Sequence, residues 1–455
     1  MKESVQIKEM PIDSVPSDTL LKNSEAILNP EEEITKYFER QDNQYLKQLE
    51  ILNGQIGEPM ETNTRLVVCI PVAGHQESKN IYQTLESFAK QKRNPKEFEV
   101  LLFVNSPERT KTESIDEINK TKAEIERAQR EFPELQIRVA QTFLPQNDIR
   151  IGNIRKILTD LALLRQRSAG ITRDLILMSN DADNQGISEE YIDSYIKYFE
   201  EHPEKEGAVG NLQYDPNAFI RFPVIHLRQE LSTFLDQVGF KNGNVTLFGG
   251  NSAIKSSIYA SIGGYPAGLK RWQHWAGDAI RKLRKKKSTL GFIAEGPLVT
   301  SGRRAVASAV FGAQGEIIFG DQESEIKMRA LDIENFPIFD YGNEEALRNL
   351  QVELEQAINQ LIDNYEKGDK LGKNSFYYRT NLEKVGIRYV VEENGAIHIT
   401  NMDRFIERQE MMQKMIKGGE RNMAKVIETS WKTAEEAEAI ISLEPQPQLS
   451  EDIPP

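Results

Sequence analysis

The chain has 455 residues, of which 39% are hydrophobic and 28% charged, and its net charge is -13 at pH 7. At ~100–200 residues per domain this length allows two or three domains, and the acidic balance argues against nucleic acid as the main partner and fits an enzyme better. The single cysteine, Cys69, excludes an intramolecular disulfide and a cysteine metal cluster. No window reaches the ~18 apolar residues of a membrane span, and the N-terminus lacks the apolar core of a signal peptide, so we expect a cytoplasmic protein.

The pattern of apolar residues predicts a helical arm followed by alternating strands and helices. Residues 1–64 are polar, with helix-like spacing from Glu31 to Ile51. The predicted strands are LVVCIPV (66–72), EVLLFV (99–104), LQIRVA (135–140) and DLILMS (174–179), and the predicted helices lie near 77–91, 112–131, 151–167 and 188–201. This alternation implies a largely parallel sheet covered on both faces, with Cys69 buried in it. Ligands of such sheets lie beyond the carboxyl ends of the strands, so the residues that follow each strand are site candidates.

The first two strand ends carry no glycine-rich phosphate loop. Pro71 to Glu77 reads PVAGHQE, which matches neither G-x-G-x-x-G nor G-x-x-x-x-G-K-[ST]. The second strand is followed by Asn105, whose carboxamide could hydrogen-bond a nucleotide base. Each turn, taken alone, is more often a structural feature than a site.

The fourth strand is followed by two carboxylates, Asp181 and Asp183, in DADNQG. Placing both charges at the exit of a buried strand is costly unless a cation lies between them. A calcium loop of the EF-hand type would need Glu where Ile192 stands, and a helix before the loop instead of a strand. A strand-borne D-x-D suits Mg²⁺ or Mn²⁺ completed by substrate phosphates, and a solvated turn before a helix at Ser188 is the alternative.

Two further segments suit a ligand site. The adjacent glycines Gly249 and Gly250 allow close backbone approach to a ligand, or form a simple tight turn. In RWQHWAGDAIRKLRKKK, Trp272 and Trp275 are separated by polar residues and followed by Asp278, which suits a sugar platform with a general base. The tryptophans could equally be core residues, and the basic run that follows is a solvated helix face or an attraction to anionic acceptors or a membrane surface.

The C-terminal part has a different pattern. One apolar stripe at helical spacing consists of Leu347, Leu350, Leu354, Ile358, Leu361 and Tyr365. Asn394-Gly395 between two β-branched runs predicts a hairpin, and the proline-rich acidic tail from Pro445 predicts disorder. This part could serve as packing, as a homodimer contact through its helices, or as an acceptor-binding module.

Residues 65–305 resemble the nucleotide-sugar glycosyltransferases of family 2, which have the GT-A fold. LVVCIPVAGHQESKNIYQTLESFAKQ is similar to the family's opening strand and helix, EVLLFVNSP to its second strand, SNDAD to its D-x-D, FGGNSAIKSSIYASIGGYP to its acceptor-side segment, and AGDAIRKLRKKKSTLGF to its E-D motif. The resemblance implies an α/β, Rossmann-like, mostly parallel sheet flanked by helices, with a helical N-terminal arm and a mainly helical C-terminal extension. The expected parts are an arm (1–64), a glycosyltransferase domain (65–325), an α-rich extension with a hairpin (326–443) and a disordered tail (444–455).

The resemblance also implies roles for individual residues. The implied nucleotide-sugar contacts are Pro71, Ala73, Glu77, Asn105, Arg155 and Asp181, the implied metal ligands are Asp181, Asp183 and His274, the implied sugar and acceptor contacts are Gly249, Gly250, Asn251, Trp272 and Trp275, and the implied catalytic base is Asp278. Two departures stand out. Asn105 replaces the family's usual Asp, and Gly277 replaces the first carboxylate of the E-D pair.

A protein of this kind would use Mn²⁺ or Mg²⁺ to move a hexose from a UDP- or GDP-sugar to a hydroxyl of a glycan, a lipid-linked or a small-molecule acceptor, with inversion at the anomeric carbon. It would work in the cytoplasm or at the inner face of the membrane. A sugar-1-phosphate nucleotidyltransferase is one alternative, although Pro71 to Glu77 lacks the glycine- and arginine-rich loop of those enzymes. A nucleotide-sugar-binding scaffold that kept the fold and lost turnover is the other, and Asn105 and Gly277 keep it open.

Overall fold

The computed structural model describes residues 28–432 except 109–111, 146–149, 242–244, 246, 248, 266–288, 313–330, 332 and 369–380. The chain divides into two compact units. Unit 1 comprises Met1–Gln213 and Asp236–Thr300, and unit 2 comprises Tyr214–Leu235 and Ser301–Pro455. The boundaries expected at 64, 325 and 443 stay predictions. Among the described helices, none combines the length and apolar character needed to cross a membrane.

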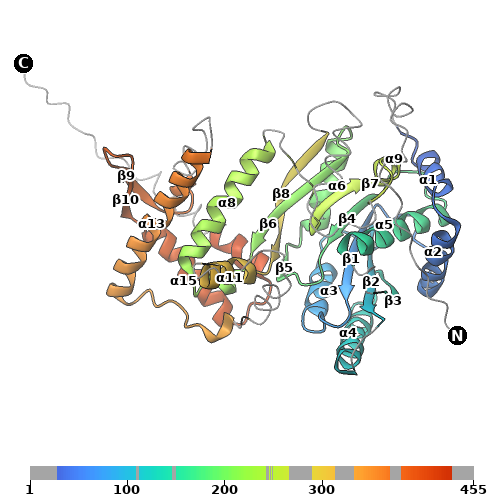
Figure 1. The fold of residues 1–455 in the computed structure, drawn as a ribbon, viewed down its shortest axis with the longest axis horizontal. Helices are drawn as coiled ribbons and strands as arrows, with labels where there is room; N and C mark the ends of the chain where they lie inside the picture. The colour runs from blue at the N-terminus through green and yellow to red at the C-terminus, as the bar shows by residue number, and fades with distance from the viewer. Residues whose placement is uncertain are drawn as a thin grey trace, which may run out of the picture. The chain divides into compact units, whose positions relative to one another are not determined.

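Unit 1 is built on an eight-stranded sheet with the order β3-β2-β1-β4-β7-β6-β8-β5. The strands are β1 (Leu66–Ala73), β2 (Phe98–Pro107), β3 (Ile137–Leu144), β4 (Ile176–Asn180), β5 (Gly186–Ile187), β6 (Gly207–Tyr214), β7 (Asn251–Lys255) and β8 (Leu290–Thr300). β3, β2, β1 and β4 are parallel, β7 runs antiparallel to both β4 and β6, and β5 runs antiparallel to β8 (Figure 1). Because β7 is antiparallel to both β4 and β6, β6 is parallel to β4. The predicted α/β class is confirmed.

Both faces of the sheet are buried because successive strand residues point to opposite sides. In β1, Val67 and Cys69 belong to one apolar core, and Val68 and Ile70 belong to another. The first core contains residues of α1 (Pro30–Glu39), α2 (Asn43–Ile56), α5 (Ile151–Ser168) and α9 (Ser256–Ser261), and the second those of α3 (Ile81–Ala89), α4 (Thr112–Glu131) and α6 (Tyr191–Glu201). Cys69 is buried, as predicted.

The predicted N-terminal helical arm is two helices instead of one continuous stretch. The chain breaks between α1 and α2 because Asp42 caps the second helix, its carboxylate accepting hydrogen bonds from the backbone N–H groups of Gln44 at 2.7 Å and Tyr45 at 3.3 Å. The break lets both helices pack against α5, where Tyr37 and Leu49 are fully buried.

A buried carboxylate joins this arm to α5. Asp160 is 0% exposed, and its oxygens accept hydrogen bonds from Tyr37 (2.7 Å), Tyr45 (2.6 Å), Tyr259 (2.9 Å) and Lys156 Nζ (2.7 Å). Burial raises the pKa of the three tyrosine hydroxyls well above its usual value, so they remain donors. We name these five residues the Asp160 cluster.

Asp160→Asn is expected to lower the free energy of unfolding of the full chain by about 3 kcal/mol or more, because it leaves the Lys156 ammonium without a buried counter-charge. Tyr37→Phe removes two hydrogen bonds, one donated to Asp160 and one accepted from Lys156 Nζ, and should cost about 2 kcal/mol. Urea unfolding followed by circular dichroism measures both changes. An Asp160→Asn cost no larger than that of Tyr37→Phe would contradict a charge-centred cluster.

Unit 2 has its own core. Its elements are α7 (Pro216–Phe219), the first part of α8 (Pro223–Lys241), α11 (Arg303–Gly312), α13 (Glu344–Gly368), β9 (Arg388–Val391), β10 (Ile397–Asn401), α15 (Asp403–Lys417) and a helix over 423–432. The apolar stripe of α13 buries Leu350, Leu354 and Ile358. The hairpin predicted at Asn394-Gly395 is present, with Gly395 at φ 85°.

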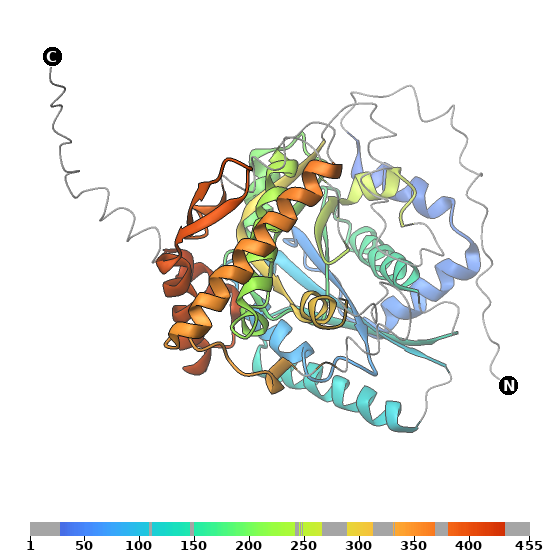
Figure 2. The ribbon, with the colours of Figure 1, turned by 60° about the vertical axis from the view of Figure 1, so that its left-hand side comes forward.

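α13 and the hairpin lie side by side (Figure 2). Asn359 both donates to the carbonyl of Ile397 at 3.1 Å and accepts from its N–H at 2.8 Å, and Glu355 accepts from the N–H of Ile399 at 2.8 Å. Side chains of the helix therefore satisfy the strand edge that β9 leaves open. The predicted mainly helical C-terminal extension is confirmed.

Candidate functional site

The predicted site residues of unit 1 meet at one edge of the sheet. Ala73 at the end of β1 pairs with Asn105 of β2, and Cys69 pairs with Ser179 of β4, so the residues after β4 lie level with the end of β1. β7 runs the opposite way, which places the glycines before it at the same edge. Residues from distant parts of the sequence are thus collected where ligands of parallel sheets bind.

Asp181 follows β4 and forms an ion pair with Arg155 of α5. Arg155 Nη2 donates to Asp181 Oδ1 at 2.6 Å, and Nη1 donates to the hydroxyl of Ser179. The Arg155 side chain is 10% exposed and that of Asp181 is 41% exposed. One carboxylate oxygen is therefore held from inside the protein, while Oδ2 has no partner among the described residues.

Gly249 and Gly250 cover this ion pair with bare backbone. A β-carbon on Gly250 would overlap Asp181 Oδ2, and one on Gly249 would lie 3.2 Å from the guanidinium of Arg155. The Ser179 hydroxyl donates to the carbonyl of Gly249 at 2.5 Å. The groups that lie closest to these glycines are side chains of this chain, so the expected approach to a ligand stays a prediction.

A buried hydrogen-bond network supports Asp181 from behind. Asn180 Oδ1 accepts from the Asp181 N–H at 2.8 Å and from Asn184 Nδ2 at 2.7 Å, while Asn180 Nδ2 donates to the Tyr191 hydroxyl at 3.3 Å. That hydroxyl donates to Asn251 Oδ1 at 2.7 Å. Asn251 is fully buried, so the structure places it behind the D-x-D segment instead of on an acceptor surface. Sequence reasoning missed Asn180, Asn184 and Tyr191, although asparagines flank both ends of the D-A-D run.

The expected nucleotide contacts lie on β1, β2 and the turn that follows. Asn105 is 5% exposed, and its Nδ2 donates to the carbonyls of Val72 at 3.0 Å and Phe103 at 3.3 Å. Its donors are therefore used inside the sheet, and Oδ1 is the atom that could accept from a ligand. Of the other expected nucleotide contacts in this region, Pro71 is buried, and Ala73 and Glu77 are half-buried.

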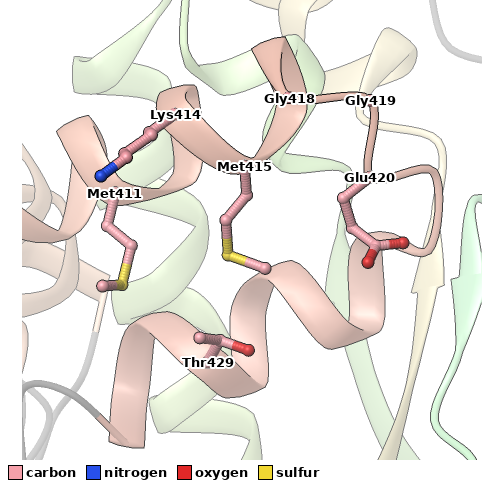
Figure 3. Close-up of a pocket in the computed structure, with 7 residues that line it drawn as sticks. All are labelled: Met411, Lys414, Met415, Gly418, Gly419, Glu420 and Thr429. Atoms are coloured by element: carbon pink, nitrogen blue, oxygen red, sulfur yellow. The ribbon is translucent and has the colours of Figure 1, made fainter.

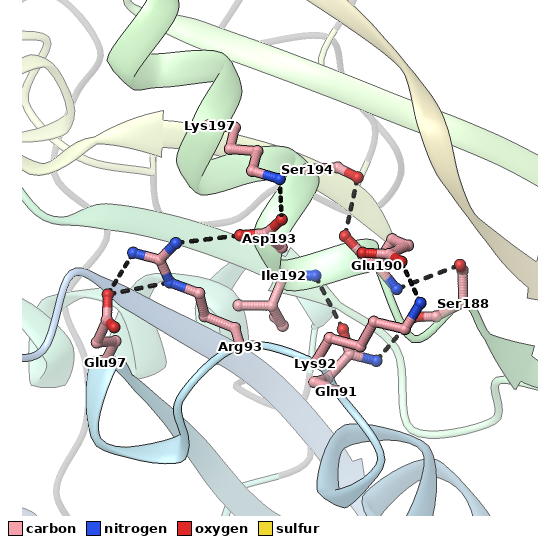
Figure 4. Close-up of polar contacts among 10 residues, drawn as sticks. All are labelled: Gln91, Lys92, Arg93, Glu97, Ser188, Glu190, Ile192, Asp193, Ser194 and Lys197. Carbon is pink, nitrogen blue, oxygen red and sulfur yellow. Dashed lines mark hydrogen bonds and ion pairs between the residues drawn. The ribbon is translucent and has the colours of Figure 1, made fainter.

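Contacts from the end of α3 hold the segment that follows the D-x-D (Figure 4). Gln91 Oε1 accepts from the N–H of Ile192 at 2.9 Å, which satisfies the start of α6, and Gln91 Nε2 donates to the carbonyl of Ser188 at 2.8 Å. Arg93 links α6 to the start of β2, donating to Asp193 at 3.0 Å and to Glu97. These contacts, which sequence reasoning missed, anchor the far end of the loop that carries Asp183.

Asp183 is half-buried between these two supports, and its carbonyl accepts from Gln185 Nε2 at 3.0 Å. The other residues of the expected site lie in 266–288, outside the described residues; they are Trp272, His274, Trp275 and Asp278. The structure therefore brings together the Asp181, Arg155 and glycine elements and leaves the predicted base untested.

Asp181 and Asp183 provide some, but not all, of the oxygen ligands that a divalent metal ion needs. Over the described residues, no group of three or more His, Cys, Asp or Glu side chains is placed to hold a metal ion. Asp181 and Asp183 supply two carboxylates, and one oxygen of Asp181 is already paired with Arg155. Mg²⁺ and Mn²⁺ accept such a set, because they keep several waters and take the remaining oxygens from a phosphate-bearing substrate.

Two surface hollows are lined by other residues. In unit 2, a hollow of about 620 Å³ between α15 and the helix over 423–432 is lined by Met411, Lys414, Met415, Gly418, Gly419, Glu420 and Thr429 (Figure 3). In unit 1, a hollow of about 280 Å³ lies beside α4 and β3, near Lys122 and Arg138. Neither is lined by a predicted site residue.

Comparison with sequence models of protein families finds no match, and comparison with curated proteins finds none. Solved structures similar to this chain include S. aureus TarS 1-349, at 14% identity over 74% of this chain and 96% of that one, with a TM-score of 0.34. The mannosyltransferase PcManGT from Pyrobaculum calidifontis, in complex with GDP-Man and Mn²⁺, has 13% identity over 77% and 98% of the two chains and a TM-score of 0.36. TarS 1-349 in complex with UDP-GlcNAc has a TM-score of 0.33. TM-scores this low do not support an inference about this chain, so the bound ligands named here are properties of those enzymes alone.

Proposed function

We propose that this chain is a metal-dependent glycosyltransferase of the hexosyl-transferring type, similar to family 2 with the GT-A fold, that moves a sugar from a nucleotide sugar to an acceptor hydroxyl with inversion. The observation that best supports it is the Asp181 carboxylate, which lies at the carboxyl edge of the parallel strands, pairs with Arg155 through one oxygen and has a side chain that is 41% exposed. A half-buried acidic pair beside a buried arginine suits a ligand that carries both a cation and phosphate oxygens.

The donor would lie along the carboxyl ends of β1, β2 and β4. Its nucleoside would border Pro71, Ala73 and Glu77, with Asn105 Oδ1 accepting a hydrogen bond from the base. Asp181 and Asp183 would hold an Mn²⁺ or Mg²⁺ ion, which supplies charge neutralisation for the diphosphate as it leaves. Arg155, which is paired with Asp181, would add a positive charge close to the diphosphate.

The acceptor side rests on residues whose roles come from the sequence. Asp278 would accept the proton of the acceptor hydroxyl as that oxygen attacks the anomeric carbon, and the bond from that carbon to the diphosphate breaks in the same step. Trp272 and Trp275 would pack against a sugar ring, and His274 would be a third metal ligand. A single displacement of this kind inverts the anomeric configuration.

Incubation of the full chain with UDP- and GDP-sugars and Mn²⁺ tests the proposal. The expected result is release of the nucleoside diphosphate, slowly to water and faster with acceptor, and product of inverted configuration by NMR. Formation of a nucleotide sugar from a sugar 1-phosphate and a nucleoside triphosphate would instead establish a nucleotidyltransferase. Binding without any turnover would establish a scaffold, and a product of retained configuration would overturn the role of Asp278.

Gly250→Ala should weaken metal-dependent nucleotide binding, because the added methyl group overlaps Asp181 Oδ2 and must displace the carboxylate. Isothermal titration calorimetry with UDP and GDP in Mn²⁺ measures the loss, expected at about tenfold or more. Gly54→Ala is the matched control, since a β-carbon there meets nothing within 4 Å. Unchanged binding by Gly250→Ala would show that Asp181 is not the ligand.

A further inference from the structure

Arg155 is a fixed charge, not a mobile one. Its two terminal nitrogens donate to Asp181 and to Ser179, and the backbone of Gly249 lies against its guanidinium. The residue belongs to α5, which packs on β1, β2 and β4. A guanidinium held on two sides and covered on a third stays beside Asp181 whether or not a ligand is bound.

This charge changes what the acidic pair offers to a cation. Asp181 and Asp183 contribute -2 and Arg155 contributes +1, so the three together carry -1. Asp181 Oδ1 already accepts a hydrogen bond from Arg155 Nη2 at 2.6 Å, so part of the negative charge of this carboxylate is neutralised before an ion arrives. The adjacent Lys156 does not add to this balance, since its ammonium is paired with Asp160 at 2.7 Å.

A divalent ion arriving alone therefore meets a weak site. It finds an Asp181 carboxylate that is already paired with Arg155, and a net charge half that of a bare carboxylate pair. It also meets repulsion from a buried guanidinium a few ångströms away, in a medium that screens charge less than water. A diphosphate removes each of these obstacles, because it supplies further oxygens to the ion and negative charge to Arg155.

We propose that Arg155 makes metal binding at Asp181 and Asp183 conditional on the diphosphate, so that ion and nucleotide bind with strong positive coupling instead of independently. The proposal rests on the proposed function, because it assumes that a diphosphate binds at this edge. Arg155 acts here as a positioning residue through Asp181. By linkage, the factor by which the diphosphate tightens Mn²⁺ equals the factor by which Mn²⁺ tightens the diphosphate.

Mn²⁺ binding to the full chain tests this without any turnover, using the electron paramagnetic resonance signal of the free ion. Titrations are made with Mn²⁺ alone and with saturating UDP, GDP, ADP, CDP or inorganic pyrophosphate. Wild-type protein should bind Mn²⁺ at least about tenfold more tightly with one of these diphosphates than alone. Arg155→Met should tighten binding of Mn²⁺ alone by about tenfold or more and reduce the coupling.

Two control variants separate the effect of the Arg155 charge from the effect of a distorted site. Arg130→Met removes a positive charge from the exposed surface of α4 and should change neither constant. Arg155→Lys keeps the charge and should keep Mn²⁺ alone weak. A distorted site would lose metal affinity, whereas the proposal requires a gain in Arg155→Met.

The outcomes are distinguishable. If no diphosphate binds with Mn²⁺, the proposed function fails. If a diphosphate binds but wild-type protein holds Mn²⁺ equally well without it, the function stands and the coupling is overturned. If Arg155→Met is unfolded by circular dichroism, the wild-type titrations and Arg155→Lys decide the question, and tight binding of Mn²⁺ alone by Arg155→Lys contradicts the role of the charge.

Discussion

Asp278→Asn is expected to lower the rate of sugar transfer by about 10²–10⁴-fold, because an amide cannot take the proton of the attacking hydroxyl. Metal-dependent binding of the nucleotide should stay within about twofold of wild type, since the D-x-D segment and Arg155 are unaltered. Transfer is measured as nucleoside diphosphate released in the presence of acceptor, and binding by calorimetry with Mn²⁺.

The combination of lost turnover and kept binding is what identifies a base. If Asp278→Asn lost both together, Asp278 would be a structural residue, and if transfer persisted, another group would remove the proton. Asp116→Asn makes the same chemical change on the exposed surface of α4 and should alter neither quantity.

Asp181→Asn is expected to remove both sugar transfer and metal-dependent nucleotide binding, whereas Asp278→Asn should remove only transfer. The amide keeps the shape of the carboxylate but cannot offer a charged oxygen to the ion, and it leaves Arg155 without its counter-charge. Loss of one preorganised electrostatic contact costs about 10²–10³-fold in turnover, and the lost ion should add to that. Stabilisation of the protein by Mn²⁺ with a nucleoside diphosphate should disappear.

The thermal unfolding midpoint with and without Mn²⁺ and UDP or GDP measures this effect, with Asp116→Asn again as the control. Because Asp181→Asn also leaves a buried guanidinium unpaired, a drop of about 1–3 kcal/mol in the stability of the ligand-free protein is expected as well. Metal-dependent nucleotide binding that survived Asp181→Asn would place the site elsewhere.

The predicted strands were found because their apolar runs are buried on both faces. In β1, successive residues such as Val67 and Val68 enter different cores, so both faces of the strand are apolar. The run therefore lacks the single polar face of an amphipathic helix. The helices α4 and α5 lie where the spacing predicted them, and the positions of Asn105 and Asp181 at one edge follow from parallel order alone.

What the sequence could not supply depends on contacts between distant segments. The Arg155–Asp181 ion pair needs α5 to pack beneath β4, and the antiparallel register Asn180 with Asn251 joins segments far apart in the chain. Spacing along the sequence contains neither. For the same reason Asn251 was expected at an acceptor surface, while the network with Tyr191 buries it completely.

The break in the N-terminal arm was missed for a local reason. Apolar spacing runs through the junction of α1 and α2, and the cap formed by Asp42 overrides it. The Asp160 cluster was missed because a buried carboxylate and its tyrosine partners come from four separate helices, and each residue alone reads as an ordinary surface polar or core aromatic residue.

A metal-dependent nucleotide-sugar site can be tested by a thermal-shift screen of nucleoside diphosphates and nucleotide sugars, run on the full chain in Mn²⁺ and again in EDTA. We expect at least one such ligand to raise the unfolding midpoint in Mn²⁺ and EDTA to abolish the rise, since a bound ligand stabilises only the folded state that holds it. A rise of equal size in EDTA, or no rise with any of these ligands, would contradict a metal-dependent nucleotide-sugar site at Asp181 and Asp183.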